Sequence, residues 1–132
     1  MEIKRLSSIE INFYWRWIEP WLEKALSDDL YNTDDIKAKV LSGDMQCWGR
    51  VNDIEIAAFA ITSVQEYPRT RIGYIHYNGG KNMKKWLHDG LVVLADFFKE
   101  FGCRSYINAC PRKGYLRYLK FDRHTTYYEK DL

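Results

Sequence analysis

One strand–turn–helix segment constrains the fold of this chain more than any other part. Alternating apolar residues over 71–77 predict a strand, and the glycine-containing stretch 78–82 predicts a turn. Apolar residues at intervals of three and four then predict a helix over about 83–101, which Gly102 ends. A strand that enters a helix through a glycine turn presents backbone N–H groups at the positive end of the helix dipole. The segment therefore predicts a seat for phosphate.

Lysines at the start of this helix add positive charge to the same place. We expect the phosphate contacts to come from the turn and the first helical turn, namely Gly79, Gly80, Lys81, Asn82 and Lys84. The alternative is a plain strand-to-helix turn with solvated lysines.

Composition indicates one globular domain spanning residues 1–132. The chain is 46% hydrophobic and 16% aromatic, which is enough to build a core. No apolar run is long enough for a membrane span, and the first residues lack the apolar stretch of a signal peptide. The odd number of cysteines, Cys47, Cys103 and Cys110, argues against a disulfide framework, and we expect a cytoplasmic protein.

The two halves of the chain differ in charge. Residues 1–66 carry 7 Lys+Arg and 12 Asp+Glu, whereas residues 67–132 carry 13 and 6. The basic half suits an anionic cofactor, and the acidic half suits a cationic amine acceptor or a basic protein partner. The alternative is ordinary surface charge. We expect no nucleic-acid partner, because no recognition helix or aromatic stacking platform stands out.

The remaining pattern predicts further helices and strands on both sides of this segment. Ser8 is the expected cap of a helix over 9–26 that Pro20 kinks or splits, and Thr33 is the expected cap of a second helix ending near Gly43. Strands are expected over 45–51 and 54–64, joined by a turn at Asn52-Asp53, and over 105–110 and 125–132, with a helix over 111–120 between the last two. The order is α-α-β-β-β-α-β-α-β, which predicts a mixed α/β fold with helices on both faces of the sheet.

That order resembles the GNAT superfamily of acyl-CoA-dependent N-acyltransferases. Residues 74–101, 104–108 and 114–132 follow the family layout, and the basic-Gly-aromatic run in 111–121 is similar to short phage-encoded members. The resemblance implies that acetyl-CoA, as co-substrate, lies where the strand before the long helix splays from its neighbour. It also implies cofactor contacts from the splayed strand, the turn and the basic helix, among them Tyr74, Ile75, Tyr77 and Arg112.

The chain departs from the family pattern at three positions. The family turn reads Gln/Arg-x-x-Gly-x-Gly/Ala, and here Asn78 takes the first position, Lys81 the middle glycine and Met83 the final small residue. The family also places a tyrosine on the penultimate helix to protonate the departing thiolate, and Leu116 stands at that position.

Acyl transfer to an amine needs a base and an acid. His76, on the splayed strand, is the first candidate base, and Glu66, at the end of the preceding strand, is the second. Tyr118 is the candidate acid. Each has an ordinary alternative: a half-buried histidine, a solvated carboxylate, a packed tyrosine. The three histidines show no metal-ligand spacing, so we expect no metal.

Two functions follow from the resemblance. The first is an acetyl-CoA-dependent N-acetyltransferase acting on an amine of a protein or small molecule. The second is a catalytically inactive protein of the same fold, acting by binding as a phage virion or host-interaction protein, located in a virion or the host cytoplasm. The departures at Lys81, Met83 and Leu116 favour the second, and the strand–turn–helix segment favours the first.

Overall fold

The computed structural model describes residues 1–26 and 30–108. Its strands form one sheet in the order of the sequence, β1-β2-β3-β4-β5. The elements, in chain order, are β1 (Glu2–Arg5), α1 (Ser8–Ala25), α2 (Thr33–Ser42), β2 (Gln46–Val51), β3 (Ile56–Tyr67), β4 (Thr70–Gly80), α3 (Met83–Glu100) and β5 (Cys103–Asn108). The expected helix over 111–120 and strand over 125–132 lie outside the described residues.

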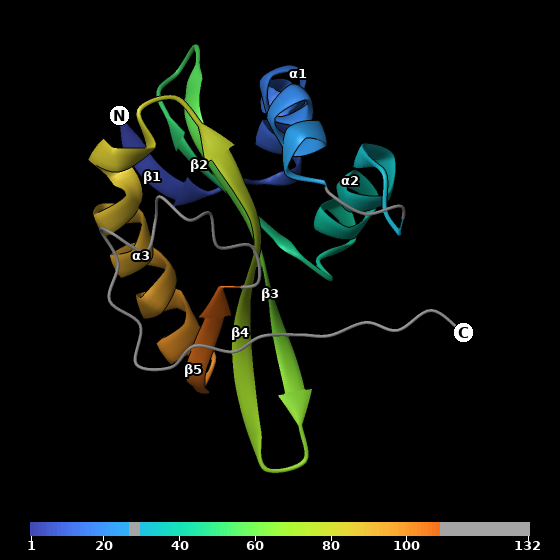
Figure 1. Cartoon of the computed structure of the whole chain (residues 1–132), viewed down its shortest axis with the longest axis vertical. Helices are drawn as coiled ribbons and strands as arrows, with labels where there is room; N and C mark the ends of the chain where they lie inside the picture. Colours follow the sequence, from blue (N-terminus) through green and yellow to red (C-terminus); the bar gives the residue numbers. More distant parts are fainter. Residues whose placement is uncertain (27–29, 109–132) are drawn as a thin grey trace.

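Helices cover both faces of the sheet, as the sequence predicted. Figure 1 shows α1 and α2 on one side and α3 on the other. The face towards α1 and α2 buries Phe59 and Ile61 of β3, and the face towards α3 buries Ala58 and Ala60 of the same strand. Alternate residues of β3 therefore belong to two separate hydrophobic cores, because successive side chains of a strand point to opposite faces of the sheet.

The first two helices begin at their predicted cap residues, so each true cap lies one residue earlier than predicted. Ser7, not Ser8, is the N-cap of α1 and forms a capping box with Glu10; Asn32, not Thr33, caps α2. Helix α1 also runs through Pro20 as one helix, so of the two expected outcomes, a kink or a split, the split is wrong. A proline inside a helix costs about 3 kcal/mol. Ile18 and Leu22, on either side, are fully buried, and each such side chain stabilises by about 1.5–3 kcal/mol.

The sequence prediction missed β1. This short strand pairs antiparallel with β2, with Glu2 opposite Val51 and Arg5 opposite Trp48. It carries three charged residues in four positions and has no alternating apolar pattern, as is common for an edge strand. The turn after β2 is also longer than predicted, because Asn52 accepts from the backbone N–H groups of Ile54 and Glu55 and β3 begins only at Ile56.

Strand β4 pairs differently on its two sides. It is antiparallel to β3 over its whole length and parallel to β5 only from Arg71 to Ile75, where Asn108 is the last described partner. The register with β3 shifts by one residue, because Ile61 lies opposite Tyr77 and Thr62 opposite Ile75. His76 is therefore the extra residue of a β-bulge.

The predicted turn over 78–82 is mostly strand. Asn78, Gly79 and Gly80 lie opposite Ala60, Phe59 and Ala58 of β3, and only Lys81 and Asn82 separate β4 from α3. Gly80 has a φ of 134°, and a Cβ there would lie 2.4 Å from the carbonyl oxygen of Ala57. This glycine is needed because the end of β4 approaches the β3 backbone more closely than any side chain permits.

We predict that Gly80→Ala destabilises the fold by about 3 kcal/mol or more, because it adds a backbone clash to a left-handed conformation. Gly43→Ala is the matched control, since Gly43 has a φ of 90° and no atom within 4 Å of the added Cβ. We expect it to cost about 1–2 kcal/mol. Urea denaturation measures both, and equal losses would show that the contact with Ala57 is unimportant.

Candidate functional site

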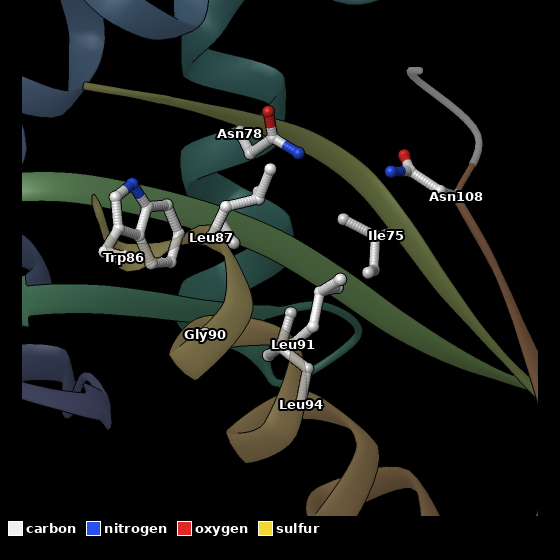
Figure 2. Close-up of a pocket in the computed structure, with 9 residues that line it drawn as sticks. Ile75, Asn78, Trp86, Leu87, Gly90, Leu91, Leu94 and Asn108 are labelled. Carbon is white, nitrogen blue, oxygen red and sulfur yellow. The ribbon is translucent and has the colours of Figure 1, made fainter. Parts of the chain in front are cut away.

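A pocket lies at the last described pair of β4 and β5, on the side of the sheet that α3 covers (Figure 2). Its interior is small, about 10 Å³ for the centre of a water-sized molecule, and the wider hollow of about 270 Å³ includes open solvent. Its walls are largely apolar and come from β3, β4, α3 and β5: Ala60, Ile75, Asn78, Trp86, Leu87, Gly90, Leu91, Leu94 and Asn108. The pocket is therefore a narrow slot between two parallel strands and the first turns of the helix that joins them.

Two asparagine amides provide polar groups in this slot. Figure 2 shows Asn78 on β4 and Asn108 on β5 extending into the space between the strands. Asn78 is 5% exposed, so its amide lies in a largely water-excluded place. An apolar slot with a few convergent polar groups is the usual form of a small-molecule site.

The start of α3 lies next to this slot and carries positive charge. Lys81, Asn82, Lys84 and Lys85 are all exposed there. Asn82 takes the N-cap position in a left-handed conformation and makes no side-chain capping bond. The backbone N–H of Lys81 donates to the carbonyl of Ala57 at 2.7 Å, so this expected phosphate donor is already used within the sheet.

Close packing explains why glycine stands at both positions before Lys81. Gly80 permits the close approach to β3 described above. Gly79 is buried, and a Cβ there would lie 3.0 Å from the Phe59 ring and 3.5 Å from Cβ of Trp21 on α1. The structure thus places Gly79 and Gly80 in the strand and leaves Lys81, Asn82 and Lys84 as the exposed members of the predicted phosphate site.

His76 lies one residue beyond the last described pair of β4 with β5, next to the slot but on the other face. Its Nε2 lies 2.6 Å from Oγ of Ser63 on β3, and its ring stacks on Tyr74 with centroids 5.8 Å apart. Tyr77 packs against the core under α1 and α2, and its ring centroid lies 6.2 Å from that of His76. Because of the bulge, these two consecutive residues share that face, while Ile75 faces α3.

The environment of His76 favours its neutral form. Burial lowers the pKa of the imidazole below its usual value, and the positive charge of Lys39 on α2 lowers this pKa further. A neutral imidazole with one unprotonated nitrogen has the state required of a general base.

The other candidates for acid–base work lie elsewhere. Glu66 sits near the tip of the β3–β4 hairpin, opposite Arg71, and its carboxylate accepts from that guanidinium at 3.3 Å. Its side chain is 74% exposed, so the structure does not bring it to the slot. Tyr118, Leu116 and Arg112 lie outside the described residues. Cys47 is buried in the core, and burial raises the pKa of its thiol to about 12, which excludes it as a nucleophile at neutral pH.

Sequence reasoning missed three polar residues of this region. Ser63 lies in an apolar strand pattern, and only its hydrogen bond to His76 distinguishes it. Asn78 was predicted to lie in a turn. An asparagine at the end of an apolar strand pattern could have indicated a buried polar group in a binding site. Asn108 follows the apolar strand residue Ile107 and is identified only when β5 is laid beside β4.

Two further findings concern the described residues alone. Within residues 1–26 and 30–108, no group of three or more His, Cys, Asp or Glu side chains is arranged to hold a metal ion. None of the helices in the same ranges combines the length and the apolar character that crossing a membrane requires.

We predict that stability falls as the pH is lowered below the ordinary histidine range. The unfolded chain binds a proton at His76 near pH 6.5, whereas the folded chain binds it only at lower pH, so stability rises with pH between these values. His76→Gln removes this contribution and flattens the profile. Denaturant midpoints between pH 5 and pH 7.5 measure it, and parallel profiles for both proteins would contradict the lowered pKa.

Comparisons with known proteins agree on the fold. No protein-family model and no curated protein sequence matches the chain. Among solved structures, a ribosomal-protein-alanine N-acetyltransferase from Brucella melitensis biovar Abortus 2308 superposes with a TM-score of 0.72 at 16% identity, covering 99% of this chain and 100% of that one. An acetyltransferase of Trypanosoma brucei gives 0.68 at 15% identity, covering 99% of both chains.

A third structure is that of the aminoglycoside acetyltransferase AAC(6')-Iy in complex with a bisubstrate analogue of CoA and acetylneamine. It gives a TM-score of 0.69 at 11% identity, covering 99% of this chain and 98% of that one. These acetyltransferases resemble the chain over almost its whole length. The mixed sheet, with β4 parallel to β5 and a helix between them, is thus that of the GNAT fold, the fold of the acyl-CoA-dependent N-acyltransferases.

Proposed function

We propose that this protein is an N-acetyltransferase that moves the acetyl group of acetyl-CoA to an amine. The observation that carries the proposal is the slot between β4 and β5, which lies beside the N-terminus of α3 and next to a half-buried, neutral histidine. The cationic helix start suits the phosphates of CoA, and the histidine suits deprotonation of the amine.

The chemical character of the slot lining supports binding of the arm of CoA. That arm is a thin chain of methylene groups and two amides, and the slot offers apolar walls with the Asn78 and Asn108 amides. Lys81, Lys84 and the first turn of α3 would hold the phosphates, with Arg112 as a further contact. When bound, acetyl-CoA supplies the acetyl group as an activated thioester.

His76 has the role of general base in this proposal. Transfer forms a carbon–nitrogen bond and breaks a carbon–sulfur bond, so the amine must lose a proton and the sulfur must gain one. His76 takes the proton from the amine, and Tyr118 is proposed to protonate the sulfur. Backbone N–H groups of Tyr74, Ile75 or Tyr77 on the splayed strand would polarise the carbonyl. Glu66, exposed and paired with Arg71, is the weaker base.

The acceptor is proposed to be a primary amine of a protein or a small molecule. Similar structures support this class, because one is titled for a ribosomal-protein alanine and another holds an acetylated aminoglycoside analogue. The excess of carboxylates in residues 1–66 supports a cationic acceptor. The free thiols of Cys47 and Cys103 support a cytoplasmic setting.

A second candidate function is binding without catalysis. Lys81 and Met83 stand where the family turn has small residues, and the Lys81 N–H is bonded to Ala57. The larger side chains leave less room for a pyrophosphate, and the bonded Lys81 N–H leaves it one backbone hydrogen-bond donor fewer. A virion or host-interaction protein on this fold would keep the sheet and lose the affinity for acetyl-CoA.

We predict that acetyl-CoA raises the midpoint of thermal unfolding. A ligand at 100 times its Kd stabilises the folded state by about 2.7 kcal/mol. Lys81→Glu should remove this shift, because it places a negative charge at the proposed phosphate site. Lys99→Glu, at the other end of α3 and equally exposed, is the matched control and should keep the shift.

The outcomes separate the two functions. No shift with millimolar acetyl-CoA would overturn the acetyltransferase proposal and favour binding without catalysis. A shift that Lys81→Glu leaves unchanged would remove Lys81 from the site while keeping acetyl-CoA as the ligand.

We predict that His76→Gln lowers kcat about 100-fold and leaves the acetyl-CoA shift intact, because general base catalysis contributes on this order. Release of the free CoA thiol in the presence of a panel of amines measures turnover. Glu66→Gln is the comparison variant. A large loss in Glu66→Gln and none in His76→Gln would transfer the role of base to Glu66.

A further inference from the structure

Ser63 and His76 form a close pair on the face of the sheet towards α1 and α2. Phe59 and Ile61 of β3 pack into the core on that face, and Ser63, two residues further along the same strand, continues their alternation. The Ser63 hydroxyl lies 2.6 Å from Nε2 of His76. Both side chains are half-buried, so this hydrogen bond is shielded from competing water.

The pair exists because of the bulge in β4. Ser63 lies opposite Tyr74, and the register shift between Ile61 and Thr62 makes His76 the residue without a partner of its own. His76 then leans back along β3 towards Ser63. The Tyr74 ring, whose hydroxyl is 2.7 Å from that of Tyr67, stacks on the imidazole. The ring of His76 is thus held by a stack on one side and by Ser63 at one nitrogen.

The other polar neighbours of His76 are few in the described structure. Tyr74 and Tyr77 contact it from its own strand, and Lys39 acts on it from α2. Ser63 faces it from β3. Of these groups, Lys39 is the one that is charged at neutral pH, and it disfavours the imidazolium.

We propose that Ser63 is a positioning residue that accepts the Nε2–H of His76, fixes this tautomer and leaves Nδ1 as the atom that takes the proton. This inference rests on the function proposed above for the part that concerns catalysis. When Nε2–H donates to Ser63, the free lone pair of the neutral ring is on Nδ1. With the hydrogen bond reversed, the Ser63 hydroxyl would cover the basic nitrogen and the base would be blocked.

The proton balance follows from this arrangement. The amine proton moves to Nδ1 and the ring becomes an imidazolium. Its Nε2–H remains bonded to the Ser63 oxygen, and this bond strengthens because the donor is now charged. Ser63 itself neither gains nor loses a proton. It offsets part of the cost that burial and Lys39 impose on the charged ring.

The first test is NMR of protein with nitrogen-15 in its histidines, which needs no substrate. The His76 signals are assigned by their loss in His76→Gln. We expect the Nε2–H tautomer in the wild type, a mixture of tautomers in Ser63→Ala, and recovery of the single tautomer in Ser63→Thr. We also expect the pKa of His76 to fall further in Ser63→Ala, because the imidazolium loses an acceptor.

Kinetics provide the second test. Ser63→Ala should lower kcat about tenfold, which is less than the loss expected when the base itself is removed. It should leave the acetyl-CoA thermal shift unchanged. The acid limb of its pH–rate profile should move to lower pH, and Ser63→Thr should restore both. Ser105→Ala, at an exposed serine of β5, is the control for loss of a hydroxyl.

The results separate the two proposals. An Nδ1–H tautomer in the wild type, or a His76 pKa unchanged in Ser63→Ala, overturns the role of Ser63. A wild type with the expected tautomer that neither binds acetyl-CoA nor transfers acetyl groups overturns the proposed function and leaves the Ser63–His76 pair as a structural feature.

Discussion

The pairing of β4 is the constraint on which the rest of the structure depends. β4 is bonded to β3 along its full length, and this fixes where its last residues, Gly79 and Gly80, lie. It is bonded to β5 from Arg71 to Ile75, and the slot lies at that last described pair. Helix α3 must begin where β4 ends, so its first turn and its lysines lie beside the slot by the same constraint. The pairing of β4 thus places the slot and the start of α3 side by side.

The bulge in β4 determines where the candidate base, His76, lies. An uninterrupted pairing would direct His76 and Tyr77 to opposite faces of the sheet. The extra residue keeps both on the face of α1 and α2, while Ile75 and Asn78 line the slot on the face of α3. Burial and the charge of Lys39 keep the imidazole neutral, and Ser63 is its hydrogen-bonding partner. The candidate base and the slot therefore lie on opposite faces of the same strand, next to the last described pair of β4 and β5.

The sequence was sufficient for the fold and insufficient for the site. Helix α3 and strand β3 each bury one set of side chains, and this burial appears in the sequence as a regular spacing of apolar residues. The positions of both elements were therefore predicted closely. The edge strand β1 has no buried stripe and was missed. The glycines at 79 and 80 were read as a phosphate turn, but they serve close packing against Phe59, Trp21 and Ala57. The pair of Ser63 with His76 depends on a register shift between strands, and no pattern within one strand reveals it.

The position of β1 has a consequence for how the chain assembles. The β3–β4 hairpin joins segments adjacent in sequence, with Tyr67 opposite Thr70, whereas β1 reaches β2 across both α1 and α2, with Glu2 opposite Val51. Closing the longer loop costs more chain entropy, so local pairs tend to form first. The strand that carries His76 can therefore find its register with β3 before β1 joins the sheet. The residues of β1 are therefore among the last to be fixed in place.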